Sequence, residues 1–137
     1  MADDVQAIQE LIRHYHQTVS DNNPEAGHAC FASERFRFVG NESEDPTRWA
    51  AVGFFSMEEI RQWENALPDD YVYTNHIEFL HTDVRDNLGL AVTSETGSTN
   101  WGSRWDGHVN VWFIGKIEGK WKILGSFHRD DSQETFQ

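Results

Sequence analysis

Two long alternating segments near the C-terminus constrain the fold more than any other part of the chain. Residues 108–113 read His-Val-Asn-Val-Trp-Phe, and after a tight turn at Glu118-Gly119 residues 120–128 form a second segment of this kind. Large aromatic side chains fall on both faces of these segments, which is typical of strands at the centre of a sheet covered on both sides. A sheet this wide usually curls, and a curled sheet capped by helices can enclose a pocket.

The period of two extends over the whole second half of the sequence. It predicts strands over 71–83, 88–97, 107–117 and 120–129, with turns at Asp86-Asn87 and Glu118-Gly119. A brief earlier strand is predicted over 36–40. Helices come first and a meander follows, so we expect an α+β domain with its helices gathered on one face of a strongly curved antiparallel sheet, a cone with an internal pocket.

Three helices are predicted before the meander. The first begins at Asp3 or Asp4, and its apolar stripe follows helical spacing. That stripe is Val5, Ile8, Leu11, Ile12, Tyr15 and Val19. A short second helix begins at Pro24 with Asn23 as its cap. The third begins at a capping box formed by Ser56 and Glu59 and ends at Pro68.

Composition narrows the class of protein. With 137 residues the chain is expected to form a single domain over 1–137. Its 11 basic and 23 acidic residues give a net charge of −12, which disfavours binding to nucleic acid or to an anionic membrane. The single cysteine, Cys30, fits a reducing compartment, and no secretory signal or apolar run of about 18 residues is present. We therefore expect a cytoplasmic protein.

The order and spacing of several short motifs resemble the SnoaL-like, or nuclear transport factor 2-like, superfamily. These motifs are residues 20–26 at the end of the first helix, residues 28–32, the 56–60 helix start, and the closing 111–113 and 119–123 hairpin. The resemblance implies a cone-shaped α+β fold and a dimer through the outer face of the sheet. It leaves the reaction open, because the superfamily includes isomerases, cyclases, dehydratases, hydrolases and non-catalytic association modules.

The steroid isomerase pattern within that superfamily fits in only one of three positions. The resemblance places the required tyrosine at Tyr15. It places the carboxylate base at about Val39 or Gly40, and the second carboxylic acid at about Val111. Both carboxylates are missing, so steroid isomerase chemistry is not expected.

The strand faces can be assigned by placing the apolar positions of residues 109–113 toward the helices. That parity predicts a pocket with walls from the first helix, the third helix and three strands. The expected pocket-lining residues are Leu11, Val19, Phe54, Trp63, Val92, Ser94, Val111, Phe113, Leu124 and Ser126.

Tyr15 and His128 are the predicted catalytic residues within this pocket. Tyr15 would polarise a substrate oxygen, and His128 would act as base or acid because histidine titrates near neutral pH. Two alternatives stay open: Tyr15 packs with its hydroxyl bonded to a neighbour, and His128 ends the sheet. His76 and Glu78 could form a further acid–base pair or an exposed polar ladder.

Neither a cofactor nor a metal is expected. No phosphate-binding loop is present, and His14 and His16 lie about 200° apart around a helix, so they cannot share one ion.

Two functions are compatible with this sequence. The first is a small-molecule pocket protein, a cofactor-independent lyase, isomerase or hydrolase that acts on an apolar, oxygenated substrate. The second is a non-catalytic homodimerisation or ligand-sensing module. The second draws on Trp112 and Phe127, which the same parity places on the outer face, where large aromatics would be unfavourable in water.

Overall fold

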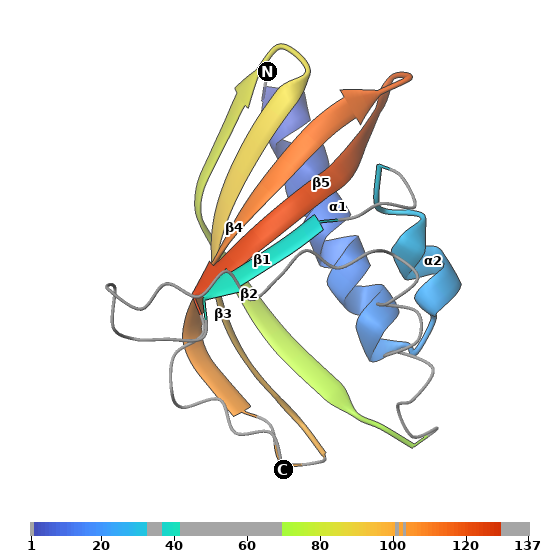
Figure 1. Ribbon diagram of the computed structural model, residues 1–137, viewed down its shortest axis with the longest axis vertical. Coiled ribbons are helices and arrows are strands. Elements are labelled where there is room, and N and C mark those ends of the chain that lie inside the picture. The colour runs from blue at the N-terminus through green and yellow to red at the C-terminus, as the bar shows by residue number, and fades with distance from the viewer. Residues whose placement is uncertain (1, 33–36, 42–69, 101, 103, 130–137) are drawn as a thin grey trace.

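The computed structural model describes residues 2–32, 37–41, 70–100, 102 and 104–129. These residues form two helices and five strands. In chain order the elements are α1 (Ala2–Ser20), α2 (Pro24–His28), β1 (Arg37–Asn41), β2 (Tyr73–Arg85), β3 (Leu88–Thr99), β4 (Arg104–Ile117) and β5 (Lys120–Arg129). Figure 1 shows a strongly bent sheet with both helices on its concave side. The predicted α+β cone is confirmed, and the third predicted helix falls outside the described residues.

The five strands form one sheet in the order β1-β5-β4-β3-β2. Strands β2 to β5 are an antiparallel meander, as the sequence predicts. β1 is the exception to the expected antiparallel sheet, because it pairs with β5 in the parallel direction. The predicted turn at Glu118-Gly119 is present, and both residues have positive φ, as a tight two-residue hairpin turn requires.

Helix α1 packs its apolar stripe on the concave face of the sheet. Ile8 and Ile12 are fully buried and belong to the same core cluster as Ile114 of β4 and Ile123 of β5. The helix ends at a left-handed residue, Asn22, and the backbone hydrogen bonds that follow it form a Schellman motif. These contacts fix α1 across the middle of the sheet, where the candidate site lies. No helix in the described part of the chain is long and apolar enough to cross a membrane.

The strand faces are inverted relative to the parity expected for β3 and β4. Thr93 and Glu95 are buried on the concave face, and the Trp112 ring lies 5.4 Å from that of His16 on α1. Alternation therefore places Val92, Ser94, Val111 and Phe113 on the convex face. The apolar-inward rule failed here because the concave face carries polar residues. Trp112, which was expected on the outer face, is 5% exposed in the core.

A bulge between β4 and β5 places Leu124 and Ser126, the two predicted pocket residues of β5, differently. Ile114 pairs with Ile123 and Phe113 pairs with Gly125, so Leu124 is the extra residue. Leu124 is 38% exposed and was wrongly assigned to the pocket. Ser126 pairs with Trp112 and is buried, so it lies on the concave side, as expected.

Candidate functional site

A buried ion pair joins α1 to the concave face of the sheet. The Nε2 atom of His16 lies 2.9 Å from Oε1 of Glu95. His16 is 8% exposed and Glu95 is 3% exposed. Charged groups are rarely buried to this degree unless they are paired and hydrogen-bonded, so this pair marks the most specialised point of the described interior.

Glu95 accepts four hydrogen bonds from four elements of the fold. Oε1 accepts from His16 and from Nδ2 of Asn75, at 2.9 and 2.8 Å. Oε2 accepts from the Thr93 hydroxyl and from Nδ2 of Asn110, both at 2.6 Å. Each carboxylate oxygen therefore has two donors, and the group is held as an anion.

Burial by itself raises the pKa of Glu95, but its hydrogen-bond partners outweigh this effect. The hydrogen bond and positive charge of His16, followed by the hydrogen bonds from Thr93 and Asn75, lower the pKa from 4.5 to about 2. A carboxylate with so low a pKa is a weak base near neutral pH. Glu95 is thus suited to holding charge and orienting neighbours.

The hydrogen-bond geometry of His16 involves both ring nitrogens. Nδ1 lies 2.8 Å from the carbonyl oxygen of Ile12, which can only accept. Nε2 faces the ionised Glu95, which also only accepts. Both ring nitrogens of His16 thus face acceptors, one on α1 and one on Glu95.

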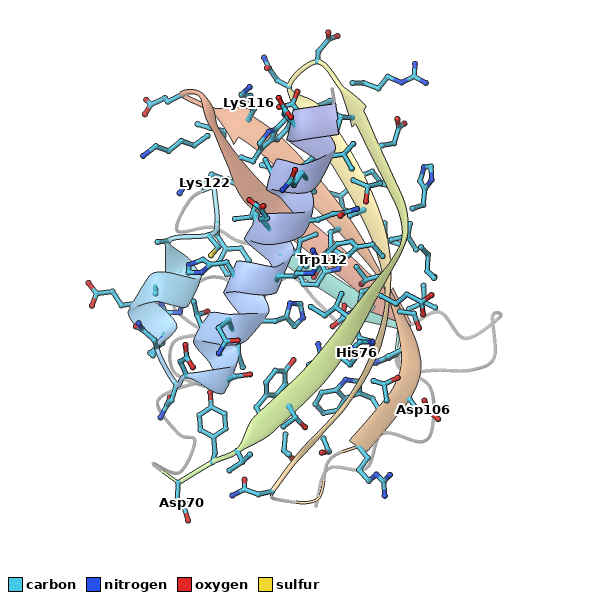
Figure 2. The ribbon with its side chains drawn as sticks, turned by 180° about the vertical axis from the view of Figure 1, so that it is seen from behind. Asp70, His76, Asp106, Trp112, Lys116 and Lys122 are labelled. Carbon is cyan, nitrogen blue, oxygen red and sulfur yellow. The ribbon has the colours of Figure 1, made fainter. Side chains whose placement is uncertain are left out.

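Two tryptophans extend this network along the sheet. The Trp112 indole N–H donates to the Thr93 hydroxyl at 3.0 Å, and the Trp105 indole N–H donates to Oδ1 of Asn75 at 2.8 Å. Trp105 lies against Gly97, where an added Cβ would come within 2.6 Å of the indole ring. A glycine at this position thus leaves room for the Trp105 ring against β3. Figure 2 shows Trp112 between α1 and the bent sheet.

Asn110 has one polar atom without a partner in the described residues. Its side chain is 9% exposed, and its Oδ1 atom is buried with no hydrogen bond. The amide cannot be flipped, because Nδ2 is the group that donates to Glu95. A buried acceptor without a hydrogen bond lowers the stability of the fold. An additional donor beside this oxygen would remove that cost.

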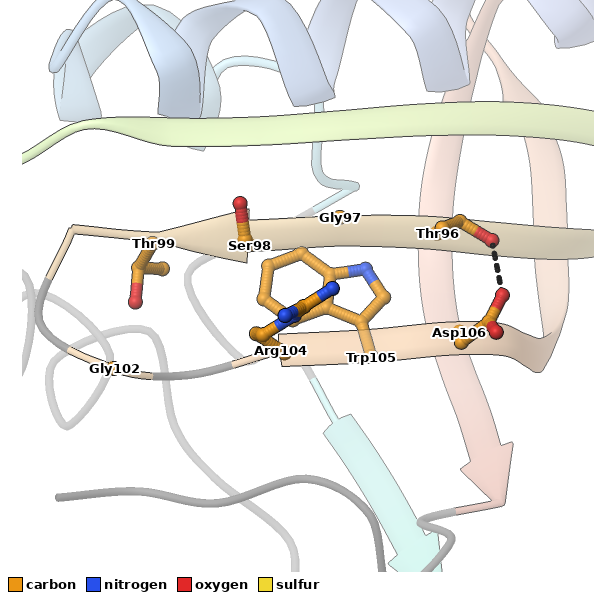
Figure 3. A pocket seen from close by; sticks show the side chains of 8 residues that line it. All are labelled: Thr96, Gly97, Ser98, Thr99, Gly102, Arg104, Trp105 and Asp106. Carbon is orange, nitrogen blue, oxygen red and sulfur yellow. Dashed lines mark hydrogen bonds between the residues drawn. The ribbon is translucent and has the colours of Figure 1, made fainter.

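An open groove of about 730 Å³ lies at the end of the β3–β4 hairpin. Figure 3 shows the residues that line it, among them Arg104, Trp105 and Asp106. Thr96 bonds Asp106 at 3.3 Å and accepts from the backbone N–H of Gly107, which tightens the hairpin here. Trp105 belongs to both the groove and the buried network, so the two features share a wall.

Of the two predicted catalytic residues, the structure describes the side chain of Tyr15 but not that of His128. Tyr15 is half-buried, and its ring packs edge-on against His16, Phe31 and Trp112 at centroid distances of 5.4, 5.1 and 6.2 Å. It therefore lies beside the ion pair. The backbone of His128 pairs with Asn110, and its side chain lies outside the described part of the structure. Both roles stay predictions.

The other predicted pocket residues divide between the two sides of the sheet. Leu11 packs against the core cluster, and Val19 is half-buried at the end of α1, where its carbonyl accepts from the Tyr71 hydroxyl. Phe54 and Trp63 lie outside the described residues. His76 and Glu78 are exposed on the edge strand β2, which agrees with the polar-ladder interpretation.

Sequence reasoning missed the residues that converge here. His16 was considered only as a metal ligand with His14, and Glu95 was not considered at all. The available signal was a carboxylate in mid-strand two residues after a threonine, together with His108, Asn110 and Trp112 at alternate positions. In the described ranges no three histidine, cysteine, aspartate or glutamate side chains gather as a metal site.

The whole-chain geometry can be compared with known proteins. No protein-family model and no curated protein sequence matches the chain. A cystatin-like protein of unknown function from Nostoc punctiforme superposes with a TM-score of 0.69 at 18% identity, covering 96% of this chain and 94% of that one. A nuclear transport factor 2-like protein of unknown function from Pseudomonas putida also reaches 0.69, at 11% identity over 100% and 96%. This chain has the nuclear transport factor 2-like, cystatin-like fold.

The same fold also occurs in proteins with other descriptions. A protein from Thiobacillus denitrificans, described as a calcium/calmodulin-dependent protein kinase type II association domain, superposes with a TM-score of 0.64. The identity is 6%, over 88% of this chain and 92% of that one. At such identities the nuclear transport factor 2-like fold is what these proteins share with the chain, and the site must be interpreted from its own residues.

Proposed function

We propose that this chain is a small-molecule binding protein whose ligand lies against the concave face of the sheet, beside His16 and Glu95. The observation that carries the proposal is the buried polar cluster around Glu95. Apolar residues of similar volume often make an interior at least as stable as a buried ion pair does, so stability alone does not account for the cluster. A few convergent polar groups among aromatic walls are the usual composition of a ligand pocket.

The saturated state of Glu95 favours binding over proton abstraction by this residue. Its oxygens already accept four hydrogen bonds, and its low pKa disfavours proton uptake. Lyase, isomerase or hydrolase chemistry on an apolar, oxygenated substrate would instead use Tyr15 and His128. The ion pair would orient the substrate for them.

Ligand binding is tested by NMR on the intact chain. We expect members of a library of small apolar alcohols to shift the indole N–H resonances of Trp112 and Trp105, because both indoles donate into the polar cluster. Trp121 is the internal control, since its indole donates to Asp4 at the far end of α1. Shifts confined to Trp121 or to the convex face, or no shifts at all, would contradict the proposal.

A second candidate function is association of two copies through the convex face. Apolar side chains are exposed there, among them Val109 at 40%, Phe113 at 47% and Leu124 at 38%. Exposed apolar residues grouped on one sheet face often mark an interface. The description of the Thiobacillus protein as an association domain supports this candidate. Phe113 and Leu124 replace Trp112 as its proposed contacts.

Association predicts a solution mass of twice 15.9 kDa for the unmodified chain. Phe113→Glu should shift this mass toward that of one chain, because a charge would be buried at the interface. Val72→Glu is the matched control, since Val72 is 54% exposed and lies just before the edge strand β2. Light scattering after gel filtration measures all three masses. A single-chain mass for the unmodified protein would exclude this dimer.

A further inference from the structure

Several side-chain donors of the polar cluster around Glu95 are already bonded within the cluster. The two ring nitrogens of His16 donate to Ile12 and Glu95, and the Thr93 hydroxyl donates to Glu95. The indoles of Trp112 and Trp105 donate to Thr93 and Asn75. Among the acceptors of the cluster, the Oδ1 atom of Asn110 is buried without a hydrogen bond.

We infer that the ligand of this site is recognised through a hydrogen-bond donor, a hydroxyl or N–H group on an otherwise apolar molecule, which binds Oδ1 of Asn110. This inference rests on the proposed function and names the chemical class of its ligand. The amide is held in one orientation by its 2.6 Å bond to Glu95, so the position of its oxygen is fixed. Asn110 would be the residue that determines specificity.

The same arrangement excludes anionic ligands. An ionised carboxylate offers only acceptors to the Asn110 oxygen, and two facing acceptors repel each other. The positive charge of His16 is already neutralised by Glu95 at 2.9 Å. An ether or a ketone of the same shape would likewise leave the oxygen without a donor, and its binding would be weaker by about one hydrogen bond.

Three probes of matched shape test this inference: cyclohexanol, methoxycyclohexane and cyclohexanecarboxylate. Binding is followed on the full chain by the Trp112 indole and the Asn110 side-chain amide resonances. We expect cyclohexanol to bind about tenfold more tightly than the ether, the effect of one buried hydrogen bond. The carboxylate should not bind. The Asn110 amide should shift with the alcohol and not with the ether.

Asn75 provides a matched control variant. Like Asn110, it donates its Nδ2 to Glu95, but its oxygen is already bonded to Trp105. Asn110→Leu should abolish the preference for alcohol over ether, so that both bind with about equal affinity. Asn75→Leu should keep the preference near tenfold. If Asn110→Leu does not fold, the two probes on the unmodified chain decide the question alone.

The outcomes separate the inference from the proposed function. Equal binding of alcohol and ether, with Trp112 shifted by both, would overturn the inference and leave the pocket in place. An Asn110 amide that no probe shifts, while Trp112 does shift, would also overturn it, because a buried water would then satisfy the oxygen. No shift of Trp112 by any probe would contradict the proposed function itself.

Discussion

Replacing Glu95 with leucine is expected to lower the free energy of unfolding by about 3–5 kcal/mol, the usual cost of removing one partner from a buried pair. The substitution leaves His16 buried without a counter-charge, and it removes the acceptor used by Asn75, Thr93 and Asn110. Domains of this size are stable by about 5–15 kcal/mol, so the loss is a large fraction of the total. Urea unfolding measures it.

The control for this substitution is Glu78→Leu on the same sheet. Glu78 is exposed, and its replacement should change the free energy of unfolding by no more than about 0.5 kcal/mol. The double variant His16→Leu/Glu95→Leu should recover part of the loss, because no unpaired charge then remains. A Glu95→Leu protein as stable as Glu78→Leu would show that the pair is not buried as described.

Acidification from pH 7 to pH 3 is expected to remove about 2 kcal/mol of stability through Glu95 alone. Its pKa is about 2 in the folded chain and 4.5 ordinarily, so the unfolded state takes up the proton first. The stabilisation is complete above about pH 5 and is lost as the pH falls through 2. The full difference between the two pKa values of Glu95 corresponds to about 3 kcal/mol of stability.

Comparison with Glu95→Gln isolates this contribution from that of the other carboxylates. The difference in unfolding free energy between the two proteins should narrow between pH 5 and pH 2, as measured by urea unfolding at fixed ionic strength. His16 on α1 and His108, the partner of Glu95 on β4, are the titratable groups nearest in the fold and in register. Parallel pH profiles for the two proteins would contradict the low pKa of Glu95.

Local chemistry predicted the elements well because their signals lie within a few residues. The stripe from Val5 to Val19 corresponds to α1, and Asn23 caps α2 by accepting from the Ala26 N–H, as its position before Pro24 predicts. The four strands of the meander begin and end within about three residues of their predicted positions. Tight turns with positive φ at Asp86 and Glu118 set these limits.

The site could not be predicted because the rule that assigns strand faces assumes an apolar interior. In β3 and β4 the apolar residues Val111 and Phe113 face outward, while Glu95 and Asn110 face α1. Polar side chains become tolerable inside only through partners contributed by distant segments. The separation between His16 and Glu95 is 79 residues, which no local pattern reveals.

The pairing of the last strand has a consequence for how the chain acquires its structure. Ile123 of β5 bonds to the backbone at Cys30 and Ala32, and β5 also carries β1 along its edge. The first forty residues therefore complete their contacts only with a segment almost a hundred positions later. Such long-range closure slows folding, so residues 30–32 and β1 should gain protection from hydrogen exchange late, in the same kinetic phase as β5.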